Sequence, residues 1–167
     1  MKKNTTLACD RLWAPWRMAY IRQKKHRGCI FCAAKKPTHP DYCFLKTGLS
    51  MALLNIYPYN NGHVMVSPLR HVADICALTK EEMLDLFQLV AKSQKMLAKL
   101  LRPEGFNIGI NIGRSAGAGI TGHLHIHIVP RWRGDSNFMP TLNNTKVLSQ
   151  SLDELYKGLI NAAKVPA

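Results

Sequence analysis

Three histidines on alternate residues, His123, His125 and His127, are the part of the sequence best suited to chemistry. Residues two apart in a strand project from the same face, so the three imidazoles would point the same way. The apolar residues between them would then face a core. Clustered imidazoles repel one another when charged and need hydrogen bonds when buried. The pattern alone leaves three alternatives open: a metal site, a catalytic site or a chance polar face.

The residues around the histidines favour catalysis. Residues 123–129 read His-Leu-His-Ile-His-Ile-Val, which resembles the signature of the histidine triad (HIT) superfamily of nucleotidyl hydrolases and transferases. Residues 55–71 are similar to the family's first substrate-binding strand pair. Residues 12–17 and 130–132 resemble its prokaryotic diadenosine-tetraphosphate phosphorylase/hydrolase-like branch. The resemblance runs from about Cys29 to Trp132, most of the chain.

The resemblance implies roles for four histidines. His125, at the middle of the triad, would attack phosphorus, because a neutral imidazole is a good nucleophile and the phosphoramidate it forms is labile. His127 would share a proton with the bridging or leaving oxygen, and His63 would complete that network. His123, the first histidine of the triad, is expected to belong to the same catalytic set. From the residues alone, His63 reads as a strand-start histidine bonded to a loop carbonyl.

A glycine-rich loop precedes the triad, and Gly117 to Gly122 matches the pattern G-x-G-x-x-G. A dinucleotide-binding fingerprint needs a helix after this pattern. A strand is expected here, so we reject that interpretation. Backbone N–H groups at Gly117 and Gly119 can approach phosphate oxygens, although a flexible hairpin connection is the alternative. Relatives often carry Ser or Thr, with a phosphate-binding hydroxyl, where this chain has Gly119, which offers only a backbone N–H. Arg114 and Ser115 lie nearby and are the candidates to replace that hydroxyl.

Three further residues are expected to bind substrate by resemblance. Asn55 aligns with the acidic or amide residue that binds the ribose hydroxyls, and an amide can both donate and accept as a diol requires. Its alternative is a turn-forming role before Pro58. Asn111 aligns with a phosphate or nucleotide contact. Trp132 aligns with a residue lining the substrate site, or it is a dimer or core aromatic.

A C-x-x-C pair, Cys29 and Cys32, indicates either a redox pair or half of a zinc site. It follows a basic loop rather than a strand, which favours zinc over a thioredoxin-like motif. Zinc-bearing relatives complete the site with residues that align with His71 and His123, and Cys₂His₂ suits a closed structural site. The alternative is a reduced pair beside two polar histidines. No organic cofactor is expected.

The composition limits the class and the partners. The 167 residues carry a net charge of +13 and 47% hydrophobic residues, which fits a globular domain that attracts polyanions. A small polyphosphate is favoured over nucleic acid, because no nucleic-acid recognition motif accompanies the charge. No membrane span or secretory leader is predicted, so we expect a cytoplasmic protein without disulfides.

The order of predicted elements favours an α+β fold with an antiparallel sheet. Strands are expected at 42–47, 50–56, 63–67, 106–111 and 123–129, and helices after Thr79 and over 151–163. Residues 1–28 read as an N-terminal arm and 29–167 as a single HIT domain. The resemblance implies a HIT-like fold, a five-stranded antiparallel sheet with flanking helices, and a homodimer.

The long helix has a clear beginning and end. Thr79 and Glu82 form a capping box, and Pro103 ends the helix. An apolar stripe at helical spacing is expected to face the core; it comprises Met83, Leu86, Phe87, Val90, Leu97 and Leu100.

These patterns predict a nucleotidyl hydrolase or transferase that cleaves dinucleoside polyphosphates of the diadenosine tetraphosphate type through nucleotidyl-His125. Water as the acceptor would make it a hydrolase, and phosphate would make it a phosphorylase. Two alternatives stay open. One is a nucleoside phosphoramidase of the same superfamily, and the other is a basic zinc-containing nucleic-acid-binding module.

Overall fold

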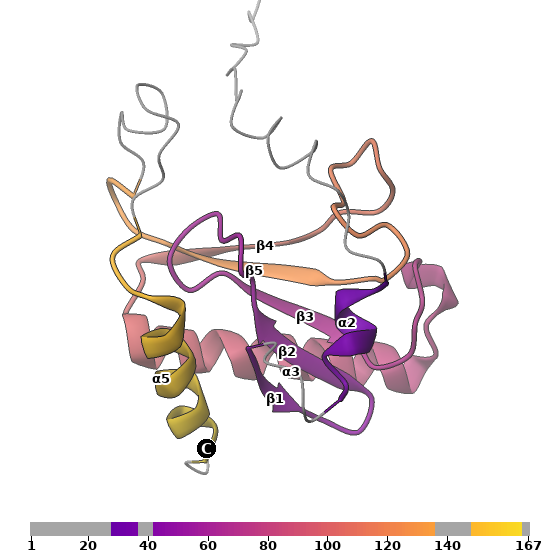
Figure 1. Ribbon diagram of the computed structural model, residues 1–167, viewed down its shortest axis with the longest axis horizontal. Coiled ribbons are helices and arrows are strands. Elements are labelled where there is room, and N and C mark those ends of the chain that lie inside the picture. Colours follow the sequence, from indigo (N-terminus) through magenta and orange to yellow (C-terminus); the bar gives the residue numbers. More distant parts are fainter. Residues whose placement is uncertain (1–27, 37–41, 136–147, 165–167) are drawn as a thin grey trace, which may run out of the picture.

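The computed structural model describes residues 28–36, 42–135 and 148–164. They form one five-stranded antiparallel sheet in the order β1-β2-β3-β5-β4 (Figure 1). The strands are β1 (Cys43–Lys46), β2 (Ser50–Leu54), β3 (Val64–Pro68), β4 (Gly105–Ile110) and β5 (Ile126–Arg131). The predicted α+β fold is therefore confirmed. Nearly all of the predicted arm, residues 1–27, lies outside the described residues.

Within the described residues, four helical segments accompany the sheet: α2 (Ile30–Ala33), the short 3₁₀ helix η1 (Ile75–Ala77), α3 (Lys80–Leu101) and α5 (Leu152–Lys164). The capping box that was predicted for α3 is present, because Thr79 and Glu82 each bond the other's backbone N–H. Arg102 ends α3 in the left-handed conformation, with φ of 46°. None of the described helices is long and apolar enough to cross a membrane.

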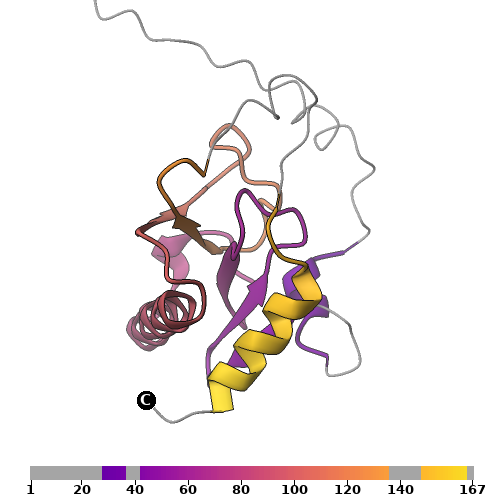
Figure 2. The ribbon, with the colours of Figure 1, turned by 90° about the vertical axis from the view of Figure 1, so that its left-hand side faces the viewer.

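The central strands β2 and β3 are buried on both faces of the sheet. Alternate residues of a strand point to opposite faces, so each strand contributes side chains to two cores. In β2, Ala52 and Leu54 belong to the larger core under α3 and α5. Met51 and Leu53 belong to a smaller core with Phe31 of α2 on the other face. Figures 1 and 2 show α2 and the long helix α3 on opposite sides of the sheet.

Two predictions about the elements need correction. The strand expected at 123–129 begins as β5 only at Ile126, because pairing with β3 and β4 starts there. The stripe on α3 was also partly wrong. Leu86, Val90 and Leu97 are buried, but the other three predicted members, Met83, Phe87 and Leu100, are exposed.

The correction on α3 has a physical reason. The helix packs against β2, β3 and β5, but not to a comparable extent against the edge strand β4. Its buried stripe is therefore narrower and includes Leu89 and Met96, which close the same helical face. Apolar side chains remain exposed on both elements: Phe87 of α3 is 52% and Ile108 of β4 is 44% exposed.

Candidate active site

The register of β3 and β5 decides which face carries the triad. His127 lies opposite Met65, which belongs to the smaller core on the α2 face. Ile126 and Ile128 lie opposite Val66 and Val64 and enter the larger core. The histidines therefore share the α2 face of the sheet, as the alternating pattern predicted.

The segment before β5 extends this alternation without being part of the strand. Leu124 is buried in the larger core, and its N–H donates to the carbonyl of Val72 at 2.7 Å. This bond holds the backbone of the segment in place, with His123 and His125 on the opposite side. The rings of His125 and His127 consequently meet edge to face, with centroids 4.8 Å apart.

His125 is 4% exposed and its ring is oriented by one bond. Nδ1 lies 2.8 Å from the carbonyl oxygen of His123, which can only accept, so Nδ1 carries the proton. Nε2 then has a free lone pair. Burial lowers the pKa of His125, with the His123 carbonyl opposing that shift. At neutral pH the ring is an uncharged imidazole with an available nucleophilic nitrogen.

Phe31 of α2 packs against the rings of both His125 and His123. Its centroid lies 4.9 Å from that of His125 and 5.1 Å from that of His123. Phe31 is fully buried. The aromatic ring therefore excludes water from one side of the nucleophile candidate.

His63 and His127 form a bonded pair, with Nε2 of His63 2.9 Å from Nδ1 of His127. Burial, and then the neighbouring histidines, lower the pKa of His63 to about 3. Burial, and then His125, lower the pKa of His127 to about 4. Both rings are therefore uncharged at neutral pH in the free site.

The loop before His63 is shaped by Gly62 and Asn60. Gly62 has φ of +76°, and a Cβ there would lie 2.5 Å from Leu101 Cδ1 and 2.9 Å from Pro130 Cγ. The buried Asn60 amide donates to the Pro130 carbonyl at 3.1 Å and to Asp135 at 2.8 Å. The loop is thereby fixed to the end of β5.

Asn55 uses both ends of its amide within this loop. Its Oδ1 accepts the N–H of Tyr57 at 2.9 Å, the turn that the residues alone suggested. Its Nδ2 lies 3.3 Å from Nδ1 of His63. Ribose binding by Asn55 stays a prediction.

The glycine loop connects β4 to the triad segment, and a strand rather than a helix follows it. Gly117 has φ of +89°, and its N–H donates to the Arg114 carbonyl at 3.0 Å. Asn111 comes directly after β4, whose last residue pairs with the first of β5. Asn111 and the loop with Gly117 and Gly119 are therefore at the His125 end of the sheet.

Trp132 lies elsewhere. It follows β5 at the end away from the glycine loop, is half-buried, and its backbone N–H donates to Asp135 at 3.2 Å. Five residue-to-residue steps, each with a rise of roughly 3.3 Å, lead from Ile126 to Arg131. The structure thus does not bring Trp132 beside His125 within the described chain, and its substrate role stays a prediction.

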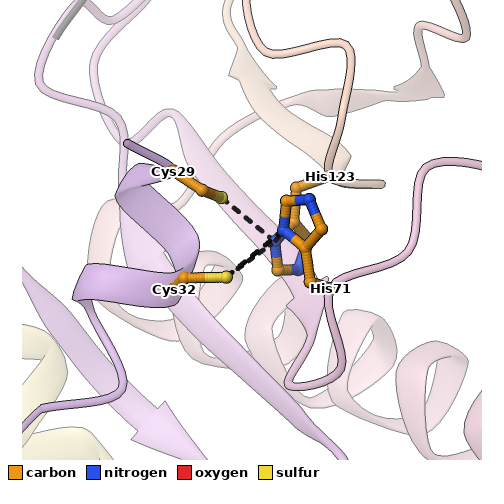
Figure 3. A group of neighbouring side chains, drawn as sticks. All are labelled: Cys29, Cys32, His71 and His123. Carbon is orange, nitrogen blue, oxygen red and sulfur yellow. Dashed lines mark hydrogen bonds between the residues drawn. The ribbon is translucent and has the colours of Figure 1, made fainter. Parts of the chain in front are cut away.

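The four predicted metal ligands do meet. Cys29 and Cys32 of the α2 segment approach His71 and His123, and the four ligand atoms lie within 4.8 Å of one another (Figure 3). Nδ1 of His123 lies 3.2 Å from both Cys29 Sγ and His71 Nδ1. Cys32 Sγ lies 3.3 Å from His71 Nδ1 and 3.7 Å from His123 Nδ1.

The four contacts of 3.2–3.7 Å are close to those around a tetrahedral metal. Zinc bonds of about 2.3 Å to sulfur and about 2.0–2.1 Å to nitrogen place ligand atoms about 3.3–3.8 Å apart. Nε2 of His123 also donates to the Pro68 carbonyl at 2.9 Å, which leaves Nδ1 as the free ligand atom. Burial, only partly offset by that carbonyl, lowers the pKa of His123 to about 4, so the ring is neutral as metal binding requires.

Comparison with known proteins decides the family. Residues 36–134 match the HIT domain model. The chain belongs to the HIT family. This confirms the family and the enzyme class predicted from the triad, a nucleotidyl hydrolase or transferase.

Named HIT relatives support the same assignment. The chain is 38% identical over 153 residues to AP-4-A phosphorylase of Mycobacterium tuberculosis, covering 86% of this chain and 78% of that protein. It is 41% identical over 92 residues to the asymmetrical bis(5'-nucleosyl)-tetraphosphatase of Schizosaccharomyces pombe, covering 55% and 50%. A Zn-bound HIT family structure from Mycobacterium smegmatis has a TM-score of 0.62 at 26% identity, covering 80% and 91%.

Two residues of this HIT site were not anticipated from the sequence. Phe31 packs on the triad, and its position within the C-x-x-C pair was the available signal. Tyr59 lies with its ring centroid 4.5 Å from that of His63 and 5.7 Å from that of His127. Its other contribution is a backbone N–H, which carries no sequence signature.

Proposed function

We propose that this HIT protein cleaves dinucleoside polyphosphates of the diadenosine tetraphosphate type through a nucleotidyl-histidine intermediate on His125. The observation that carries the proposal is the buried, uncharged His125 with an unprotonated Nε2, next to the His63–His127 pair. The named activities of the M. tuberculosis and S. pombe relatives support the substrate class.

The reaction has two halves. His125 Nε2 attacks the α-phosphorus, a phosphorus–nitrogen bond forms, and the bond from phosphorus to the bridging oxygen breaks. His127 donates a proton to the departing polyphosphate oxygen. Water or phosphate then attacks the phosphoramidate, the phosphorus–nitrogen bond breaks, and the incoming oxygen loses its proton to His127.

Substrate recognition draws on the glycine loop and on the charge of the chain. The backbone N–H of Gly119, together with Asn111, would bind phosphate oxygens beside His125. The N–H of Gly117 already donates to the Arg114 carbonyl, so Gly117 would shape the loop. The net charge of +13 attracts a polyphosphate to the protein. Trp132 lies at the far end of β5 from His125. It would contact substrate only if it belonged to the site of a second subunit, or if a long substrate extended that far.

Zinc is the metal that fits the Cys29, Cys32, His71 and His123 cluster best, on ligand type, number and spacing. The Zn-bound M. smegmatis relative supports this choice. Bound zinc would supply a structural cross-link. It would tie the helix α2 to the triad segment, with no open position for Lewis-acid chemistry.

A homodimer in the cytoplasm is the proposed state of the protein. Among residues 42–135, β4 pairs only with β5, so its outer edge is open to pair with a second copy. Ile108, on that edge strand, is 44% exposed and supplies apolar surface. A two-fold axis would match this self-complementary surface with itself. Sedimentation of Ile108→Lys against wild type tests it: an unchanged sedimentation coefficient contradicts this interface.

Product chromatography tests the proposed reaction. Wild-type protein and His125→Ala are incubated with diadenosine tetraphosphate, with and without inorganic phosphate. ADP plus ATP formed only with phosphate would identify a phosphorylase, and AMP plus ATP a hydrolase. His125→Ala should bind nucleotide and keep its circular dichroism spectrum while losing turnover. No wild-type turnover, or full turnover by His125→Ala, contradicts the proposal.

A further inference from the structure

A chain of hydrogen bonds that begins at a backbone amide runs into the His63–His127 pair. The N–H of Tyr59 lies 3.0 Å from Nδ1 of His63. A backbone N–H can only donate, so Nδ1 of His63 must be the acceptor and carries no proton. This assignment holds for the neutral ring of His63.

The side chain of Asn55 supplies a second donor to the same nitrogen. Its orientation is fixed because Oδ1 accepts the N–H of Tyr57 at 2.9 Å, another group that can only donate. The NH₂ end therefore faces His63, with Nδ2 3.3 Å from Nδ1. Two donors converge on one lone pair, and both disfavour a proton there.

The position of the proton on His63 determines the position of the proton on His127. Neutral His63, only 1% exposed, must keep its proton on Nε2 and donate it to Nδ1 of His127, 2.9 Å away. His127, with Nδ1 occupied as an acceptor, must carry its own proton on Nε2. That nitrogen is the one left to meet a substrate oxygen beside His125.

We propose that Asn55 is a positioning residue, which acts through His63 to keep the proton of His127 on Nε2, where a leaving oxygen can take it. The catalytic consequence rests on the proposed function, whereas the arrangement of protons does not. Asn55 touches His63 rather than the reacting atoms, and both ends of its amide are already bonded within the loop.

An aspartate is the informative replacement. Asn55→Asp keeps the size and keeps an oxygen for the Tyr57 N–H. The second carboxylate oxygen would face Nδ1 of His63, where it requires a proton on that nitrogen. The Tyr59 N–H would then face a second donor. Asn107→Asp is the matched control, because Asn107 bonds Arg131 on the exposed edge strand.

The arrangement of protons is measured first, without substrate. Nitrogen NMR of histidine-labelled full-length protein at pH 7 should show Nδ1 unprotonated and Nε2 protonated in both His63 and His127. In Asn55→Asp, Nδ1 of His63 should shift to the protonated position, and in Asn107→Asp it should not. A wild-type His63 protonated on Nδ1 would overturn the inference even if no variant folds.

Kinetics on diadenosine tetraphosphate complete the test. For Asn55→Asp we expect kcat about 10- to 100-fold lower with KM changed less than about threefold, since a misdirected general acid loses part of its contribution. A higher KM with unchanged kcat and unchanged His63 shifts would make Asn55 a substrate ligand instead. Absence of wild-type turnover would contradict the proposed function, while the NMR result would still test the proton positions.

Discussion

Two groups of histidines share one face of the sheet and differ in what lies against their ring nitrogens. In the catalytic group of His63, His125 and His127, each Nδ1 has a partner whose donor or acceptor role is defined. In the group with the cysteines, Nδ1 of His71 and of His123 face each other at 3.2 Å. Ring nitrogens bonded in series can hold and pass protons, whereas ring nitrogens that converge with thiol sulfur are arranged for a cation.

The largest expected effect is the loss of activity when His125, in the catalytic group, is replaced. His125→Ala should lower kcat/KM by about 10³-fold or more, because it removes the unprotonated Nε2 that forms the intermediate, while Nδ1 of His63 and of His127 are already occupied as acceptors. Steady-state assays measure the loss. A decrease below about tenfold would show that His125 is not the nucleophile.

Removing a cysteine ligand should act on stability instead. Cys32→Ser is expected to lose bound zinc and to lower the free energy of unfolding by about 3 kcal/mol when zinc is present at about 100 times its Kd. Elemental analysis and urea unfolding, with and without a chelator, measure both. Cys76→Ser, an exposed cysteine outside the cluster, is the control and should change neither.

A change at Gly62 tests the loop that holds His63. Gly62→Ala should destabilise the protein by roughly 1–3 kcal/mol, because its φ is positive and the new methyl group would collide with Leu101 and Pro130. Gly48→Ala, with nothing within 4 Å of its Cβ position, should change stability little. Equal effects of the two substitutions in urea unfolding would contradict this explanation.

The catalytic pair should also make stability depend on pH. His63 and His127 have folded pKa values of about 3 and 4, below the ordinary 6.5, so the unfolded chain binds more protons between these limits. Stability should be complete above about pH 6.5 and should fall as the pH drops toward 4, by up to about 1.4 kcal/mol per pH unit for each histidine. His63→Asn should show a shallower slope. Identical slopes in urea titrations would refute the role of His63.

The sequence predicted the family, the antiparallel sheet and both histidine groups, because these depend on residue types at fixed spacing. The alternating histidines around His125 and the C-x-x-C pair can be recognised from the sequence alone. The exposed face of α3 was not predicted, because hydrophobic periodicity does not say how far a sheet extends beneath a helix. The beginning of β5 depends on strand pairing. The influence of Tyr59 comes from a backbone group that every residue except proline possesses.

His123 contributes three atoms to three different partners. Nδ1 faces the cysteines, Nε2 bonds the Pro68 carbonyl, and its own carbonyl orients His125. Two of the three atoms belong to the ring, and no other side chain offers two nitrogens with this geometry. In a saturation library scored for function, position 123 should therefore accept fewer amino acids than position 71. His71 is exposed and offers the cluster only one ligand atom. The chain's mutational tolerance would then be lowest at the residue that joins the two groups.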